Sequence, residues 1–297
     1  MKNIITFDDV KIKNMLPQRK PFSNKGDFGR VLIIAGSREM CGCCVLAALG
    51  ALRSGAGIVQ LAFPEDLYIP VLSQLTECVF VPLKSTDGHI DANEIPKILY
   101  NCENADTVMF GCGVGTSDDL VKITEALVKL NKTPLVIDAD GINCLSRNIG
   151  ILKEKSCEIL LTPHPKELSR LIFTSVKDIE NNRQRVIEEL SEEYNISVLL
   201  KGHETLVTSY YSDYVYKNTT GNTGLSKGGA GDLLSGIISA LCVNLGGDLY
   251  KSACIGAYIH GKCADVLRDT YSEIAMLPSD CALALPQVYS QILSVGD

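Results

Sequence analysis

The sequence predicts an α/β fold in which a mainly parallel sheet lies between two layers of helices. Three observations lead to this prediction. Short aliphatic runs alternate with helical patterns through the first 200 residues, and this alternation is typical of βαβ units. Most of the aliphatic runs end in a loop rich in Gly, Asp, His or Thr. The chain has 297 residues, 46% of them hydrophobic, which is enough for a sizeable core.

Each predicted strand is short, aliphatic and bounded by Gly, Pro or polar residues, and each predicted helix has an apolar stripe at helical spacing. After residue 201 the alternation stops. TLVTS and YVYKN then predict a small antiparallel pair at the sheet edge, and nearly everything from 228 onward is predicted helical. No linker or repeat interrupts the pattern, so we expect a single domain over 1–297. The predicted strands are 31–35, 58–63, 78–81, 106–110, 135–137, 159–161 and 198–201, and the predicted helices before residue 200 are 43–53, 91–100, 118–130 and 177–194.

Charge and composition exclude several classes of protein. The net charge of −7 argues against a nucleic acid or an anionic membrane surface as partner. The N-terminal segment has no apolar signal core and no run reaches membrane-spanning length, so we expect a cytoplasmic protein. The twelve cysteines are scattered through apolar segments, which favours reduced thiols. The tight group CGCC at 41–44 leads into a predicted buried helix, and we interpret it as packing rather than as a metal site.

The polar loops that follow the strands predict where the site lies. They read GS, GCGVG, DADGIN, TPHPKE and KGHET in chain order. In open parallel sheets, ligands bind beyond the carboxyl ends of the strands. We therefore expect these loops to converge on one side of the sheet.

The segment SKGGAGD (226–232) combines a glycine loop with an acid. Glycines let backbone amides approach an anion, and the apolar residues that follow predict a helix whose N-terminus favours negative charge. Asp232 then lies in the first helical turn. Taken alone, the segment is either a tight turn with a helix-start acid or an anion site with a base. A carboxylate beside such amides is useful if it removes a proton from a hydroxyl that attacks a bound phosphorus. The apolar residues of this helix are Leu233, Leu234, Ile237, Ile238 and Leu241.

Other polar residues in these loops are candidates too. His164 lies between two prolines at a strand end, which favours ligand contact over a structural role. Lys201 ends a strand and is either a cation for phosphates or a solvated strand-end lysine. In DADGIN, Asp138, Asp140 and Asn143 either orient polar substrate groups or magnesium-bound water, or cap the following helix; we prefer function for Asp140 and Asn143.

Several motifs together resemble one family. GNTGLSKGGAGDLLSG (221–236) is similar to the GNxGMAxGGxGDxLxG signature of the NAD(P)H-hydrate dehydratase branch of the ribokinase-like superfamily. In the same order, FGCGVG resembles GPGLG, VIDADGIN resembles VIDADALN, LTPHPKEL resembles LTPHPGEM, and VLLKGHETLV resembles VLKGxxTxV. The N-terminal segment 29–59, with its ALRSGAG, also resembles that family. The resemblance covers roughly residues 25–290.

The resemblance implies a ribokinase-like three-layer fold and a repair reaction. The substrate would be the (6S)-hydrated form of NADH or NADPH. ADP or ATP would phosphorylate its C6 hydroxyl with Mg²⁺, and phosphate would then leave, giving AMP or ADP. The resemblance also implies the free-standing form of the enzyme and a homo-oligomer, typically a tetramer. The small-residue helices 43–57 and 252–264 would suit such an interface or equally the core.

The resemblance also implies individual roles. Asp232 would be the catalytic base and a substrate contact, with Gly228, Gly229, Ala230 and Gly231 as the anion hole. Glu167 would help position magnesium through phosphate or water, or act only as a first-turn helix acid. The remaining ligand contacts divide into two sets. The hydrated dinucleotide would contact Cys43, Gly113, His164, Asp140 and Asn143, and the nucleotide would contact Lys201, Gly202, His203, Glu204, Thr205 and Gly231.

The chain departs from the family pattern at several of these positions. Cys43 stands where Ala is usual, and Cys112 replaces the proline of GPGLG. His203 and Glu204 occupy positions where small residues are common, and Ala230 lacks a hydroxyl that many members have. Two alternatives remain open: a small-molecule kinase of the same superfamily acting on a sugar, a hydroxymethylpyrimidine or a thiazole alcohol, and a non-catalytic dinucleotide-binding regulator.

Overall fold

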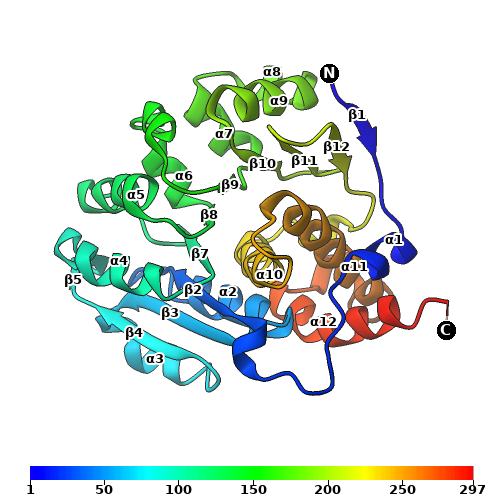
Figure 1. Ribbon diagram of the computed structural model, residues 1–297, viewed down its shortest axis with the longest axis horizontal. Helices are drawn as coiled ribbons and strands as arrows, with labels where there is room; N and C mark the ends of the chain where they lie inside the picture. Colours follow the sequence, from blue (N-terminus) through cyan, green and yellow to red (C-terminus); the bar gives the residue numbers. More distant parts are fainter. Residues whose placement is uncertain (297) are drawn as a thin grey trace.

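The computed structural model describes residues 1–296, in which a ten-stranded sheet lies between two layers of helices (Figure 1). The strand order is β1-β12-β11-β10-β9-β8-β7-β2-β3-β4. All neighbours are parallel except β11, which is antiparallel to both β10 and β12. The strands are β1 (Asn3–Ile5), β2 (Arg30–Ile34), β3 (Ile58–Pro64), β4 (Val79–Leu83), β7 (Thr107–Phe110), β8 (Leu135–Ile137), β9 (Ile159–Leu161), β10 (Ser197–Leu200), β11 (Leu206–Ser209) and β12 (Tyr214–Lys217); β5 (Ser85–Thr86) and β6 (His89–Ile90) form a separate hairpin.

The helices divide between the two faces of the sheet (Figure 1). One face is covered by α4 (Ile95–Glu103), α5 (Asp118–Leu130), α6 (Asp140–Leu145), α7 (Pro165–Ile172), α8 (Val176–Asn181) and α9 (Arg183–Tyr194). The other carries α2 (Gly42–Arg53), α3 (Tyr68–Leu72), α10 (Ala230–Asn244) and α11 (Leu249–Ala275), with α12 (Pro278–Leu293) and α1 (Asp9–Met15) outside them. Short 3₁₀ turns are η1 (Lys25–Phe28), η2 (Glu65–Leu67), η3 (Ala92–Glu94), η4 (Ile149–Glu154) and η5 (Thr223–Leu225).

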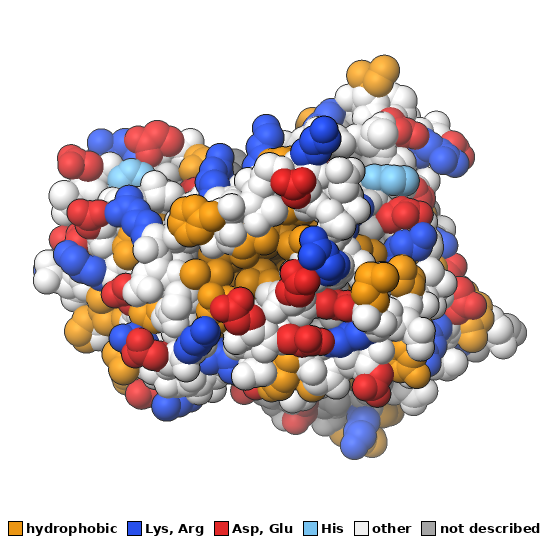
Figure 2. All heavy atoms as spheres, turned by 90° about the horizontal axis from the view of Figure 1, so that it is seen from above, with side chains coloured by type: hydrophobic (Ala, Val, Ile, Leu, Met, Phe, Trp, Pro, Cys, Tyr) orange, Lys and Arg blue, Asp and Glu red, His pale blue; other side chains and the backbone are white. Residues whose placement is uncertain are grey.

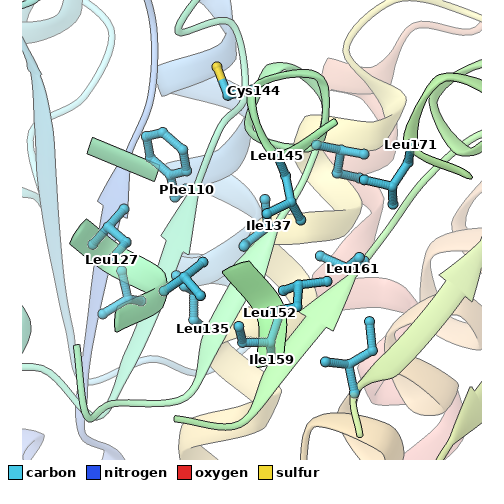
Figure 3. Close-up of a cluster of buried hydrophobic side chains, with 14 of the residues drawn as sticks. Phe110, Leu127, Leu135, Ile137, Cys144, Leu145, Leu152, Ile159, Leu161 and Leu171 are labelled. Atoms are coloured by element: carbon cyan, nitrogen blue, oxygen red, sulfur yellow. The ribbon is translucent and has the colours of Figure 1, made fainter. Parts of the chain in front are cut away.

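The buried strands explain why the sheet has helices on both faces. In β2, Leu32 and Ile34 contact the α4–α9 layer, whereas Val31 and Ile33 contact the α2 and α10 side. This alternation follows from the two-residue period of a strand. Figure 3 shows part of the core on the α4–α9 side of the sheet, where side chains of β7, β8 and β9 lie among those of α5, α6 and α7.

Two glycines let α10 lie very close to α2. A Cβ added at Gly236 would lie 2.0 Å from the Ala47 carbonyl oxygen, and one added at Gly50 would lie 2.4 Å from the Leu233 carbonyl oxygen. The small residues of α2 therefore serve the core of this chain. In α11, a Cβ added at Gly256 would similarly lie 2.6 Å from Ile238 Cγ1 of α10.

The structure confirms most predicted elements and refines a few. The predicted bounds 118–130, 135–137 and 159–161 are those of α5, β8 and β9. The predicted helix 177–194 is two helices, α8 and α9, because the backbone of Asn182 leaves the helical region. The antiparallel pair β11–β12 is confirmed, and β1, which the sequence analysis did not predict, pairs with β12 on its outer side. Within residues 1–296, no helix combines the length and apolar character needed to cross a bilayer. On the face shown in Figure 2, cationic, anionic and hydrophobic side chains are interspersed.

Candidate functional site

The polar strand-end loops meet at the carboxyl edge of the sheet, around one buried ion pair. Lys201, directly after β10, places its Nζ 2.6 Å from Oδ1 of Asp138, directly after β8, and 3.7 Å from Oε2 of Glu167 in α7. The three residues follow three neighbouring strands, so their convergence follows from the parallel order of β8, β9 and β10.

Asp138 is the central acceptor of this cluster. Its side chain is 1% exposed, and it accepts hydrogen bonds from Lys201 Nζ, from Ser235 Oγ at 2.7 Å and from the Ala139 amide at 2.8 Å. The Cys112 thiol donates to Oδ2 at 3.7 Å. Burial opposes ionisation of Asp138, but Lys201 and these donors outweigh it and hold the pKa of the carboxyl below its usual value.

The charges of the two partners are set by the same cluster. Burial raises the pKa of Glu167 to about 6, although Lys201 opposes the shift. Burial disfavours the charged ammonium of Lys201, but Asp138 and Glu167 raise its pKa above the usual value, so it stays protonated. Lys201 is therefore a fixed positive charge at the base of the site.

Helix α10 begins directly above this charge. A Cβ added at Gly231 would lie 3.3 Å from Lys201 Nζ and 3.5 Å from Asp138 Oδ2. Ser235, one turn further along α10, ties the helix to Asp138. The first turn of α10 thus lies close against the ion pair and is tied to it by a buried hydrogen bond.

The loop before α10 has the geometry of an anion site. Gly229 has a φ of 95°, a conformation that glycine adopts without strain, and the space beside Gly228 is open. Among the described residues, no protein acceptor is bonded to the amides of Gly228, Gly229 or Gly231. The Ala230 amide instead donates to the Lys227 carbonyl at 3.3 Å, so it is partly used within the turn. Three free amides at the N-terminus of a 15-residue helix favour an anion.

Asp232 lies in the first turn of α10, as predicted, and is half-buried. Burial raises the pKa of its carboxyl, Asp138 adds to the shift, and the thiols of Cys112 and Cys43 and the charge of Lys201 oppose it. Asp232 is therefore more basic than an exposed aspartate, which suits a proton acceptor.

Two of the departures from the family pattern surround this carboxyl. The Cys43 and Cys112 thiols both interact with Asp232, and burial raises the pKa of both. They are neutral hydrogen-bond donors rather than nucleophiles. A Cβ added at Gly113, whose φ is 64°, would lie 2.7 Å from the Cys43 Sγ, so the predicted pair Cys43 and Gly113 is in contact.

His164 and Glu167 form a capping box at the start of α7. His164 Nδ1 accepts from the amides of Lys166 and Glu167, each at 3.1 Å, and Glu167 Oε2 accepts from the His164 amide at 2.7 Å. Burial and the charge of Lys201 lower the pKa of His164, so its ring is neutral at neutral pH. Its Nε2 lies 3.2 Å from Glu167 Oε1, and 43% of the side chain is exposed. Glu167 is a first-turn helix acid and also part of the buried cluster.

Asp140 and Asn143 are joined in a network at the rim. Asp140 Oδ2 accepts from the Gly115 amide at 3.0 Å, and Asn143 donates to Asp140 Oδ1 at 3.3 Å. Arg170 of α7 then donates to Asn143 Oδ1 at 3.1 Å. The residue between the two aspartates of DADGIN, Ala139, has a φ of 52°, a strained conformation that is common at functional sites.

The KGHET loop forms the other flank. His203 and Glu204 are exposed, and Glu204 pairs with Lys217 of β12 at 3.0 Å. Thr205 Oγ1 donates to the Gly202 carbonyl at 3.0 Å. Arg183, the first residue of α9, reaches this loop from the helix layer and donates to the His203 carbonyl.

Three residues that organise the site were not expected from the sequence: Ser235, Arg170 and Arg183. A fourth, Asp138, was a candidate within DADGIN, but Asp140 and Asn143 were preferred to it. Asp138 was visible in DADGIN, but nothing in the sequence showed that it faces Lys201. Ser235 lies in an apolar helical run, and Arg170 and Arg183 look like ordinary surface cations of polar helices. For these residues, only the contacts reveal the role.

The donor set around Glu167 decides how magnesium could be held. Both Glu167 oxygens already face protein donors, and among residues 1–296 no group of three or more Asp, Glu, His or Cys is arranged to hold a metal ion. The carboxylates Asp138, Asp140, Glu167 and Asp232 nevertheless outnumber the cation Lys201. These residues fit a magnesium ion carried by phosphates and water, with Glu167 reached through water, rather than a protein-built cage.

The chain is similar to a protein family and to known proteins over most of its length. The family model described as NAD(P)H-hydrate dehydratase matches residues 31–287. An ADP-dependent (S)-NAD(P)H-hydrate dehydratase from Neisseria meningitidis is 34% identical over 88% of this chain and 84% of its own length. A bifunctional NAD(P)H-hydrate repair enzyme from Moorella thermoacetica is 32% identical over 93% of this chain. The chain spans about half the length of that enzyme and of other bifunctional relatives.

A solved structure shares the whole architecture. The ADP/ATP-dependent NAD(P)H-hydrate dehydratase from Bacillus subtilis, co-crystallised with ATP and Mg²⁺, is 25% identical and superposes with a TM-score of 0.83, covering 98% of this chain and 99% of that one. The ribokinase-like fold expected from the resemblance is confirmed by a ribokinase-like protein from Enterococcus faecalis with a TM-score of 0.84. From its sequence, its fold and the arrangement of these loops, the chain belongs to the NAD(P)H-hydrate dehydratase family.

Proposed function

We propose that this chain restores NADH and NADPH from their (6S)-hydrated forms, consuming ADP or ATP and releasing phosphate. The observation that carries the proposal is the position of Asp232. Its carboxyl, made more basic by burial, stands beside the free amides of Gly228, Gly229 and Gly231, above the fixed charge of Lys201. A base next to an anion hole is what phosphorylation of a hydroxyl requires.

In this proposal Asp232 removes the proton of the C6 hydroxyl while that oxygen attacks the terminal phosphorus of the nucleotide. The loop amides hold the transferring phosphoryl oxygens, and the nucleotide leaves with one phosphate fewer. The ring nitrogen then expels the C6 phosphate, and loss of the neighbouring C5 proton restores the dihydronicotinamide. Mg²⁺ bound to the phosphates would offset their charge in a site with an excess of carboxylates.

The substrate contacts follow from the two flanks of the site. Cys43, Gly113 and His164 would contact the hydrated dinucleotide, with Asp140 and Asn143 orienting its polar groups. The neutral His164 ring keeps part of its surface exposed, which supports direct contact. Loop 201–205 would hold the adenine nucleotide, with its exposed residues His203 and Glu204 free to face it.

The ion pair with Asp138 limits how Lys201 could act on a bound phosphate. Its ammonium is bound to Asp138 and close to Glu167, and 18% of the side chain is exposed. We therefore propose that it stabilises phosphate charge from beneath Gly231 while remaining paired to Asp138.

The test is recovery of the absorbance of the reduced ring when the protein is mixed with hydrated NADH, Mg²⁺ and either ADP or ATP. Asp232→Asn should keep nucleotide binding and reduce turnover by about 10²–10⁴-fold, the usual contribution of a general base. Asp178→Asn, which changes a first-turn acid of α8, is the matched control. No recovery with either nucleotide would refute the proposal. Accumulation of a phosphorylated product without ring recovery would indicate a kinase instead.

Three further expectations belong to this proposal: a cytoplasmic location, bound magnesium and a homotetramer. The twelve cysteines are all free thiols, which supports a reducing compartment. The helices 43–57 and 252–264 contribute small residues to the core of this chain, so a tetramer interface would use other surfaces. Light scattering after size exclusion measures the oligomeric state, and titration of Mg²⁺ against nucleotide affinity measures the metal requirement.

A further inference from the structure

Arg183 connects the α4–α9 layer of helices to the KGHET loop. It is the first residue of α9, and only 18% of its side chain is exposed. Its guanidinium donates from Nη1 to the His203 carbonyl and from Nη2 to the Leu200 carbonyl at 3.5 Å. A Cβ added at Gly202 would lie 3.2 Å from Nη2. The two terminal nitrogens of the fork therefore contact the backbone of residues 200–203.

The loop needs such support in its middle. Its two ends are fixed by backbone hydrogen bonds, from the Lys201 amide to Pro163 at 2.9 Å and from the Asn218 amide to Thr205 at 2.8 Å. Between these ends, Gly202 has a φ of 148° and Glu204 a φ of 52°. The second is an unfavourable conformation for a residue with a side chain, and it persists only where contacts maintain it.

Lys201 is anchored by its buried pair with Asp138, but beyond Lys201 the side-chain contacts of the loop other than those of Arg183 are local or exposed. The Thr205 hydroxyl donates to a carbonyl within the loop, so this bond leaves the loop free to move as a unit. The Glu204–Lys217 ion pair is half-exposed and therefore weak. The guanidinium instead offers two donors from a different element, and the weak ion pair of its Nε with Glu180 at 3.9 Å does not compete with them. An ammonium could not reproduce this fork.

We propose that Arg183 is a positioning residue for nucleotide binding: it holds loop 201–205 in the conformation that receives the adenine nucleotide. The inference rests on the proposed function, in which that loop holds ADP or ATP. Arg183 acts through the His203 and Leu200 carbonyls. Its effect falls on nucleotide affinity and leaves the chemistry at Asp232 unchanged.

The experiment measures the Kd of ADP with Mg²⁺ by calorimetry, on the full chain, without any hydrated substrate. Arg183→Met should raise the Kd about tenfold, which corresponds to about 1.4 kcal/mol, because loop ordering must then be supplied by the nucleotide. Arg183→Lys should give an intermediate Kd. The matched control is Arg185→Met two residues along α9, whose side chain is 57% exposed and pairs with the exposed Glu189. In the dehydration assay, Arg183→Met should raise KM for ADP, while kcat and KM for hydrated NADH stay close to those of the unaltered protein.

Gly202→Ala, which strains the loop directly, separates the two ways to fail. If Gly202→Ala weakens ADP binding and Arg183→Met does not, the Arg183 inference is wrong and the nucleotide loop stands. If neither variant changes the Kd, both the inference and the nucleotide role of the loop are wrong. If Arg183→Met does not fold, Arg183→Lys decides: an unchanged Kd would refute the need for a guanidinium fork.

Discussion

The buried pair Lys201–Asp138 gives the strongest prediction about stability. Replacing Lys201 with Met keeps most of the side-chain volume and removes the charge. Asp138, 1% exposed, then loses its 2.6 Å partner and stands beside Glu167 and Asp232 without a cation. Removing one member of a buried pair costs about 3–5 kcal/mol, because a buried charge is left uncompensated.

The corresponding change in melting temperature follows from the length of the chain. With an unfolding entropy of about 2.1 cal/mol/K per residue, a chain of this size has about 0.6 kcal/mol/K, so the expected drop in Tm is about 5–8 °C. The second substitution, Asp138→Asn, should restore much of that loss when combined with Lys201→Met, because both charges are then gone. A coupling of at least about 2 kcal/mol between the two sites is expected.

The assay is urea unfolding of the two single variants and the double variant, followed by circular dichroism. Lys129→Met is the matched control, since its 2.8 Å pair with Glu154 has similar geometry but is exposed, and we expect no measurable change there. Additive losses in the double variant, or an equal loss in Lys129→Met, would refute the argument that burial makes the Lys201–Asp138 pair costly to break.

Three further predictions concern packing and titration. Gly236→Ala would place a Cβ 2.0 Å from the Ala47 carbonyl oxygen and should lower the free energy of unfolding by about 3 kcal/mol or more. The control Gly42→Ala, with open space around it, should not lower it. Equal thermal stability of the two variants would contradict this prediction. Because the Cys43 thiol lowers the pKa of Asp232 from its raised value, Cys43→Ala should move the acid limb of kcat/KM to higher pH, and an unmoved limb would show that the thiol does not act on the base. The folded pKa of Glu167 is raised to about 6, above its ordinary value of 4.5, so its stabilising contribution is complete below pH 4.5 and is lost as the pH rises through 6; Glu167→Gln should remove that part of the pH dependence of urea unfolding.

The periodicity of apolar residues along the sequence was sufficient to predict most strands and helices of the fold. The aliphatic runs at 135–137 and 159–161 and the amphipathic run at 118–130 coincide with β8, β9 and α5, because their burial is set by local pattern. The strand β1 could not be predicted in this way. It has three residues, of which Asn3 and Ile4 are exposed, and it exists because β12 offers it an edge. The break at Asn182 was missed because the polar pattern of 177–194 continues across it.

For the candidate site too, some features follow from local sequence and others only from the tertiary structure. By itself, the sequence determined that polar loops follow the parallel strands, that glycines precede a helix carrying Asp232, and which family these motifs belong to, because each is a local pattern of residue types. Tertiary structure alone decided that Asp138 is the partner of Lys201, that Ser235 ties α10 to it, and that Arg183 supports the loop 201–205. These contacts join residues 17 to 97 positions apart, and no local pattern encodes which charges share a buried space.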